Sequence, residues 1–197
     1  LMRNPGAMVI YDVKCTGRLA DFVLRHGGSP QMWKTGHSLI KARMAQTDAE
    51  LAGEMTGHFF FRERWYGFDD GLYAAARLLE ILALRDESPQ EVLAGLPDAV
   101  STPEIKVPVE QGTPHALMSL VLSAAQGPDT PFVGGRVSTI DGLRVDFTDG
   151  WGLVRASNTT PMLVLRFEGD DEAALERIKS LFRSQLQPLV GSTALGF

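Results

Sequence analysis

The sequence predicts two domains, an α/β domain to about Pro97 and a smaller α+β domain after it. Three observations support this prediction. In the first half, short apolar runs alternate with helical patterns, which is typical of a mainly parallel sheet covered by helices on both faces. Residues 97–114 contain four prolines and mark a change in composition. Beyond them, short strands separated by Asp-Gly turns indicate an antiparallel sheet.

The first domain, residues 1–97, is predicted to be a three-layer α/β unit with a mixed, mainly parallel sheet. Its strands are expected from short apolar runs at 8–13, 31–34 and 50–61, the last interrupted by a loop. Its helices are expected where apolar residues recur at helical spacing, over 17–28, 36–47, 71–84 and 86–97.

Several of these helices carry start or stop signals. The pair Gly27-Gly28 provides a C-terminal stop for the first. Asp70 can cap the third, and Ser88 with Glu91 forms a capping box on the fourth. The third helix also carries an apolar stripe, the pattern of a helix that packs against other elements. The stripe consists of Leu72, Ala75, Ala76, Leu79 and Leu82.

The second domain, residues 98–197, is predicted to be an antiparallel sheet backed by helices. Its proline-rich start suits a linker followed by an edge strand, because proline cannot donate a ladder hydrogen bond. Strands are expected at 136–140, 143–147, 151–155 and 162–167, with Asp-Gly turns at 141–142 and 149–150. Helical patterns cover 115–126 and 171–189.

Bulk properties exclude several classes of function. The 197 residues carry a formal net charge of -5 without a dense Lys/Arg block, so a nucleic-acid partner is not expected. No apolar run has bilayer length and no signal peptide is recognisable, so no membrane partner is expected. The single Cys15 cannot form an internal disulfide, which favours a cytoplasmic location.

Common cofactor and metal motifs are absent from the sequence. It contains no G-x-G-x-x-G, no phosphate-binding P-loop motif and no G-x-S-x-G elbow. The four histidines show no metal-ligand spacing, so no metal site is predicted. Because the chain starts at Leu1 and enters a strand almost at once, we interpret it as a piece of something longer.

The connection between the last two predicted strands is unusually polar. Arg155 is followed by Ser157, Asn158, Thr159 and Thr160. Arginine offers a planar fork of donors that matches phosphate oxygens, and a tight loop can add hydroxyl and backbone donors. The alternative is a polar loop whose side chains only satisfy their own turn. Residue types alone do not decide between a phosphate site and such a turn.

A second polar loop, GEMTGH, interrupts the strand at 50–61. Two glycines permit a bend that would let Glu54, Thr56 and His58 point into one space. A carboxylate there can accept hydrogen bonds from neighbouring sugar hydroxyls. The alternative, which this motif alone favours, is a bulged strand with an exposed glutamate and a structural histidine.

Lysine and histidine follow the other predicted strands of the first domain. Lys14 comes directly after the first strand, while Lys34 and His37 follow the second. Open α/β folds bind ligands at the carboxyl ends of their strands. A lysine after a strand is usually only solvated, so these residues are suggestive only together with the GEMTGH loop.

The order of these motifs resembles that of the α-D-phosphohexomutases. YDVKCT, WKTGHSLIK, GEMTGH, FDDGLYAAARLLE and RASNTTP look like the C-terminal half of this family, with bacterial phosphomannomutase/phosphoglucomutase as the nearest branch. Phosphoglucosamine mutases usually have glutamine in place of Met55 and a Ser-Gly-Thr core in the phosphate loop. The resemblance implies domain 3, with a sugar-recognition loop, over 1–97 and domain 4, with a phosphate-binding loop, over 98–197.

The resemblance also implies roles for individual residues. Glu54 and Thr56 would bind the sugar 3- and 4-hydroxyls beside His58, with Thr56 in place of the commoner serine. Lys14 and His37 would line the cleft against the sugar and its phosphate. The phosphate that is not being transferred would be bound by Arg155, Ser157, Asn158 and Thr159.

The activity implied by the resemblance is the interconversion of hexose 1-phosphate and hexose 6-phosphate through hexose 1,6-bisphosphate. The family's phosphoserine loop and its Mg²⁺ loop belong to two earlier domains, and neither motif occurs in these 197 residues. The expected partners are a hexose phosphate and the missing N-terminal domains, with no cofactor and no catalytic residue in this piece. The alternative is a stand-alone, non-catalytic phosphosugar-binding module.

Overall fold

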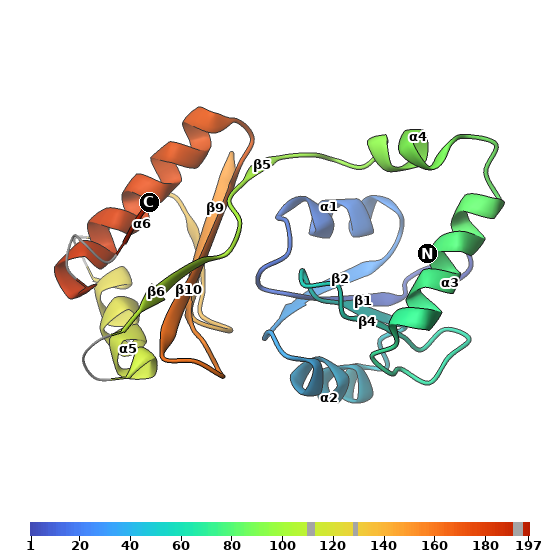
Figure 1. Cartoon of the computed structure of the whole chain (residues 1–197), viewed down its shortest axis with the longest axis horizontal. Helices are drawn as coiled ribbons and strands as arrows, with labels where there is room; N and C mark the ends of the chain where they lie inside the picture. Colours follow the sequence, from blue (N-terminus) through green and yellow to red (C-terminus); the bar gives the residue numbers. More distant parts are fainter. Residues whose placement is uncertain (110–112, 128–129, 191–194) are drawn as a thin grey trace. The chain divides into compact units, whose positions relative to one another are not determined.

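The computed structural model describes residues 1–109, 113–127, 130–190 and 195–197. The chain forms two compact units, Leu1–Asp98 and Ala99–Phe197 (Figure 1). The first contains a mixed sheet with helices and the second an antiparallel sheet with helices, so the predicted fold class is confirmed.

The sheet of the first unit has the strand order β2-β1-β3-β4. The central strand β1 (Met8–Asp12) pairs in parallel with β2 (Ser29–Trp33) and with β3 (Leu51–Gly53). The strand β4 (Phe59–Phe61) pairs antiparallel with β3, which makes the interrupted 50–61 segment a hairpin around the GEMTGH loop. Since β1, β2 and β3 are parallel, the loops that follow them leave the sheet at the same edge.

Helices α1 (Arg18–Arg25) and α2 (His37–Thr47) lie on opposite faces of this sheet (Figure 1). Apolar side chains from α2 and the strands form the core, which consists of Ile10, Ile40, Met44, Ala49, Ala52 and Phe60. These buried side chains hold the three strand ends in place, and the polar loops extend from that support.

Two further helices, α3 (Gly71–Ala83) and α4 (Pro89–Ala94), follow β4. Their predicted caps are confirmed: the Asp70 carboxylate accepts a hydrogen bond from the Tyr73 backbone N–H, and Ser88 with Glu91 forms a capping box. The apolar stripe predicted on α3 does not pack on the sheet, however. None of the residues of α3 is buried, and the helix contacts β4 through Tyr73 and Arg77, which lie outside the stripe.

The second unit is built on a six-stranded antiparallel sheet. The strands β5 (Val100–Ser101) and β6 (Ile105–Pro108) both pair with β10 (Met162–Gly169) at one edge. Beyond β10 come β9 (Gly150–Ala156), β8 (Leu143–Phe147) and β7 (Arg136–Ser138). The strand β7 ends at Ser138, two residues before the expected end at residue 140.

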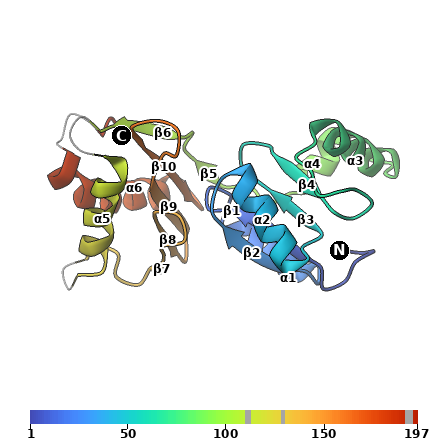
Figure 2. The ribbon, with the colours of Figure 1, turned by 90° about the horizontal axis from the view of Figure 1, so that it is seen from below.

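Helices α5 (Pro114–Ala125) and α6 (Glu172–Val190) lie together on one side of this sheet (Figure 2). Phe182 of α6 is fully buried, and its ring packs 5.3 Å from that of Phe167 on β10, measured between centroids. Met118 and Val121 of α5 extend the same core. The paired strands β9 and β10, supported by this core, carry the RASNTTP connection at one end.

Candidate functional site

In the first unit, the fully buried carboxylate of Asp12 connects the three strand-end loops. Its Oδ1 accepts hydrogen bonds from Cys15 Sγ at 3.1 Å and from the Met55 backbone N at 3.2 Å, while its Oδ2 accepts one from Thr35 Oγ1 at 3.0 Å. These partners lie on the loops after β1, β2 and β3. Sequence reasoning missed Asp12, although an acidic residue at the end of a buried strand is a signal for such a role.

Lys14 is also buried, at the end of β1. Its Nζ lies 3.9 Å from Asp12 Oδ2, which makes an ion pair with very little exposure to solvent. Water screens a pair of this kind weakly, so the cation is held at a defined position. Lys14 is therefore a fixed positive charge of the first unit.

The Glu54 carboxylate is held in place from both sides, with only 6% of the residue exposed. Its Oε1 accepts a hydrogen bond from the Gly36 backbone N at 3.0 Å, and its Oε2 accepts one from Thr56 Oγ1 at 3.5 Å. Gly57, at φ +89°, closes the turn by donating its N–H to the Glu54 carbonyl oxygen. An ionised carboxylate has about four lone-pair sites, so these two contacts leave acceptor capacity for a ligand's hydroxyls.

The two histidines of the first unit differ in their contacts. His58 Nδ1 lies 2.8 Å from Asp69 Oδ2, so the imidazole is oriented by a carboxylate that sequence reasoning did not assign. His37 is exposed at the first position of α2, where its Nδ1 lies 3.5 Å from Ser38 Oγ. The loop after β2 contacts both Asp12, the ion-pair partner of Lys14, through Thr35 and Glu54 through the neighbouring Gly36. His58 contacts Asp69 instead.

In the second unit, Arg155 on β9 is only 5% exposed. Its Nε donates a hydrogen bond to Asp141 Oδ2 at 3.0 Å, whereas its buried Nη2 has no hydrogen-bond partner among the described residues. Most buried polar groups in proteins have a partner. Trp151 Nε1 and Arg166 Nε of the same unit are also buried without a hydrogen-bond partner among the described residues. Arg155 differs from them because it begins the hydroxyl-rich RASNTTP connection, which makes its Nη2 the candidate ligand position of this unit.

The turn that carries Asp141 is pressed against β9. Gly142 has φ +84°, and a Cβ added there would lie 2.4 Å from the Val154 carbonyl oxygen and 2.7 Å from the Arg155 Cα. Only glycine accommodates both the positive φ and the contact. The Asp141-Gly142 turn, predicted as a plain hairpin turn, thus also holds the carboxylate that orients Arg155.

The hydroxyls of the RASNTTP connection are partly used within the loop itself. Ser157 Oγ accepts hydrogen bonds from Thr160 Oγ1 at 2.8 Å and from the backbone N of Thr160 and of Thr159, at 3.2 and 3.3 Å. These contacts are those of the self-satisfied polar turn, yet none uses the hydroxyl proton of Ser157. Thr159 and Asn158 are exposed. The loop is thus internally ordered and still has donors to offer.

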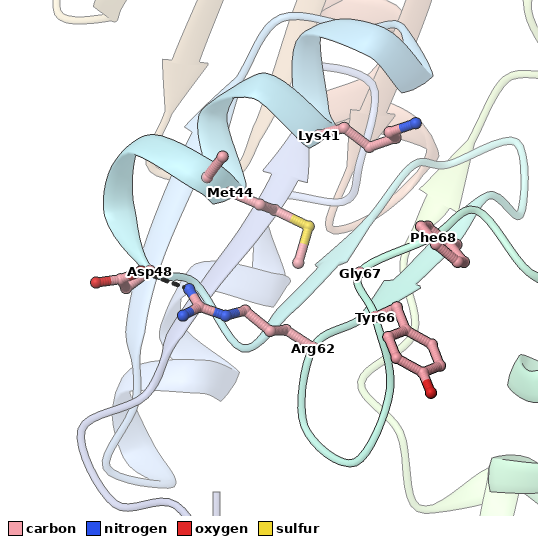
Figure 3. A pocket seen from close by; sticks show the side chains of 8 residues that line it. Lys41, Met44, Asp48, Arg62, Tyr66, Gly67 and Phe68 are labelled. Atoms are coloured by element: carbon pink, nitrogen blue, oxygen red, sulfur yellow. Dashed lines mark hydrogen bonds and ion pairs between the residues drawn. The ribbon is translucent and has the colours of Figure 1, made fainter.

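A cavity of about 410 Å³ lies elsewhere in the first unit (Figure 3). Asp48, whose Oδ1 lies 2.6 Å from Arg62 Nη1, precedes β3, and Arg62 follows β4, so the cavity is at the opposite end of this hairpin from Glu54. None of the predicted site residues lines it. Its walls are formed by Lys41, Met44, Ala45, Asp48, Arg62, Tyr66, Gly67 and Phe68.

Within the described ranges, no three His, Cys, Asp or Glu side chains cluster in a way that could hold a metal ion. The Mg²⁺ that the family resemblance implies therefore has no candidate ligand set among the described residues. The helices that the structure describes include none long and apolar enough to cross a membrane.

Comparison of the sequence with models of protein families identifies the family of this chain. The family model described as phosphoglucomutase/phosphomannomutase, alpha/beta/alpha domain III, matches residues 1–100. A second model, for the C-terminal domain of the same family, matches residues 104–185. The chain belongs to the phosphoglucomutase/phosphomannomutase family.

Individual relatives agree with this assignment. The phosphomannomutase/phosphoglucomutase of Pseudomonas aeruginosa is 53% identical over 195 residues, 99% of this chain and 41% of the relative. A phosphoglucomutase of Neisseria meningitidis is 54% identical over 189 residues, 95% of this chain and 40% of the relative. The chain thus spans about two fifths of the length of these relatives and corresponds to domain III and the C-terminal domain of the family.

Solved structures of the phosphoglucomutase/phosphomannomutase family share the fold. A family protein from Burkholderia thailandensis has a TM-score of 0.89 and 54% identity, and the match covers 100% of this chain and 41% of that one. A phosphoglucomutase from Paramecium is 15% identical with a TM-score of 0.68, which extends the likeness in fold alone. In family terms, Glu54 lies in domain III and Arg155 in the C-terminal domain.

Proposed function

We propose that this chain is the substrate-binding half of an enzyme that interconverts hexose 1-phosphate and hexose 6-phosphate, with glucose or mannose as the sugar. The reaction would proceed through hexose 1,6-bisphosphate. The names of the relatives, phosphomannomutase/phosphoglucomutase and phosphoglucomutase, support this substrate class. The observation that carries the proposal is the buried Arg155, whose Nη2 has no partner among the described residues and lies at the start of an ordered hydroxyl-rich loop.

The GEMTGH loop would recognise the sugar. Glu54 and Thr56 would bind the 3- and 4-hydroxyls, and the Gly36 contact holds the carboxylate in position before the substrate arrives. Preorganisation of this kind avoids part of the ordering cost of binding. Lys14 and the histidines His37 and His58 would complete the sugar and phosphate contacts of the first unit.

The RASNTTP loop would hold the phosphate that is not transferred. Arg155 would supply a charge-assisted donor, with further donors from Ser157, Asn158 and Thr159. Asp141 keeps the guanidinium oriented through Nε, which leaves Nη2 for the ligand. Because Nη2 has no protein partner among the described residues, it can donate to a phosphate oxygen while Nε keeps its hydrogen bond to Asp141.

Contacts to the 3- and 4-hydroxyls and to one phosphate would allow the bisphosphate to bind in two orientations and would allow both glucose and mannose to be accepted. Hydroxyls 3 and 4 lie nearly opposite the axis that exchanges C1 and C6, so the same contacts can form in either orientation of the bisphosphate. Glucose and mannose differ only at C2, which neither set of contacts would bind. An enzyme built this way would accept both sugars.

The 197-residue chain by itself would not catalyse the reaction. The phosphoserine and the Mg²⁺ loop implied by the family resemblance lie outside it, and the described residues contain no cluster suited to a metal ion. We expect the intact polypeptide, supplied with Mg²⁺ and glucose 1,6-bisphosphate, to convert glucose 1-phosphate into glucose 6-phosphate. The 197-residue chain should show no turnover in the same coupled assay, and turnover by it would disprove this assignment of roles.

Calorimetry separates this proposal from a stand-alone binding module. Titration of the 197-residue chain with glucose 6-phosphate should give millimolar affinity or no measurable heat, because half of the binding surface is absent. A micromolar affinity that Arg155→Ala abolishes would instead support a module that binds phosphosugars without catalysis. Inorganic phosphate as a second titrant shows whether the sugar contributes to any binding seen.

A further inference from the structure

Helix α3 presents its apolar side chains to the surrounding solvent. Leu72 is 87% exposed and Leu79 is 65% exposed, and Ala75 and Ala76 between them are exposed as well. These four residues belong to the stripe that the sequence predicts as a packing face. We call them, together with the half-buried Leu82, the leucine stripe.

The opposite face of α3 is already packed within the first unit. The Tyr73 ring stacks on Trp65 with 4.4 Å between centroids, and it meets the Phe61 ring edge-on at 5.5 Å. The Arg77 guanidinium lies 4.9 Å from the centre of the Phe61 ring, and its Nη1 is 2.6 Å from Glu63 Oε2. These aromatic and ionic contacts fix the rotation of the helix, so the leucine stripe faces outward.

This arrangement inverts the usual pattern of a surface helix, in which the apolar stripe faces the core and charges face water. The charged residues of α3 are Arg77 and Glu80, and both take part in the inner contacts with Glu63 and Arg64. No charged residue is left to interrupt the leucine stripe. A contiguous apolar surface without charges is typical of an interface.

The N-terminal residues lie next to this helix. Arg3 Nη1 is 3.5 Å from Glu80 Oε1, so the chain enters the first unit beside α3. The family model matched by the first unit is domain III, and the chain spans about two fifths of its relatives' length. The polypeptide of an intact family member that precedes Leu1 would therefore reach the first unit beside α3, on the side of the helix where Glu80 lies.

We propose that the leucine stripe of α3 is a contact surface, covered in the intact protein by the polypeptide that immediately precedes Leu1. This inference rests on the packing of α3 and on family membership, and does not depend on how the loops bind a sugar. In the intact protein, Leu72 and Leu79 would be buried against this preceding polypeptide, and α3 would be apolar on one face and ionic on the other because both faces are packed.

Photo-crosslinking in the intact polypeptide tests the occupant. A photoreactive phenylalanine analogue is placed at Leu79, and in a matched control at Leu120 of α5, which is 56% exposed in the other unit. Mixing isotopically light and heavy protein distinguishes links within one molecule from links between copies. We expect the probe at Leu79 to link to residues before Leu1 of the same molecule. Light–heavy links from this probe, or links only to residues within 1–197, would overturn the proposal.

Cysteine labelling gives a second measure that needs no large side chain. The labelling rates of Leu79→Cys and Leu120→Cys are measured in the intact protein by peptide mass spectrometry, each relative to its rate in denaturant. Burial predicts at least a tenfold slower rate at position 79 and a rate close to the denatured one at position 120. A rate at position 79 within a factor of about two of the denatured one would refute the contact. Neither experiment uses activity, so a failure of the proposed function would be seen separately.

Discussion

Replacing Arg155 tests the proposed phosphate site most directly. Arg155→Ala removes the donor that would reach the ligand and leaves Asp141 without its Nε contact at 3.0 Å. A hydrogen bond to a charged group contributes about 1.5–3 kcal/mol. At about 1.4 kcal/mol per tenfold change, affinity for the hexose phosphate should fall about 10- to 100-fold.

Two further variants show how much of this loss of affinity is due to the charge of Arg155 and how much to its geometry. Arg155→Lys keeps the positive charge but loses the planar fork, so it should recover only part of the affinity. Asp141→Asn keeps an acceptor for Nε without its charge, so it should weaken binding less than Arg155→Ala does. All three are compared in the intact polypeptide by KM for glucose 1-phosphate, with the melting temperature of each variant as the measure of folding.

The reasoning fails if Arg155→Ala leaves KM unchanged while the variant remains folded. It also fails if Arg155→Ala and Asp141→Asn lower the melting temperature equally and change KM equally. In that case the pair would have only a structural role, and the free Nη2 would not mark a ligand position.

Three further predictions follow from other contacts. Glu54→Gln keeps the shape of the side chain but loses the charge, so KM should rise about tenfold, or about 1.4 kcal/mol, with little change in melting temperature. Gly142→Ala should lower the free energy of unfolding by about 1–3 kcal/mol or more in denaturant titrations; Gly134→Ala, also at positive φ but with nothing within 4 Å, should cost less, and equal costs would contradict the predicted clash. Hydrogen bonds from Arg64 lower the pKa of Glu80 from 4.5 to about 2, so its stabilising contribution is present above pH 4.5 and is lost as the pH falls toward 2. Melting temperatures measured over this range should fall less steeply for Glu80→Gln than for the unmodified protein, and identical slopes would rule out the contribution.

Local signals in the sequence located the two polar loops of the candidate site. The glycines of GEMTGH and the polar run after Arg155 are visible in the sequence because a turn needs particular residues within a few positions. The sequence also raised the possibility that the RASNTTP loop only satisfies its own turn, and the contacts of Ser157 show that this is partly so. Which donors remain free depended on side-chain geometry that residue types do not specify.

The partners of the site residues were not predictable in the same way. Asp12 accepts a hydrogen bond from the Met55 N–H, 43 residues further along the chain, and Asp69 meets the His58 ring across 11 residues. Asp12 lies in YDVKCT and Asp69 in FDDGLYAAARLLE, but neither stretch indicates which residue its aspartate contacts. A contact of this kind exists only once the strands are paired, so a pattern read along the chain cannot reveal it.

Periodicity and capping chemistry were sufficient to determine the fold class, the helix starts at Asp70 and Ser88 and the two polar loops, because each depends on residues within one or two turns of backbone. Tertiary structure alone decided which face of α3 is packed. The apolar spacing of that helix is compatible with packing on the sheet, but the aromatic and ionic contacts of Tyr73 and Arg77 turn the leucine stripe away from it. Which face of a helix is buried depends on the residues of other segments that pack against it. The sequence of the helix alone does not specify those residues.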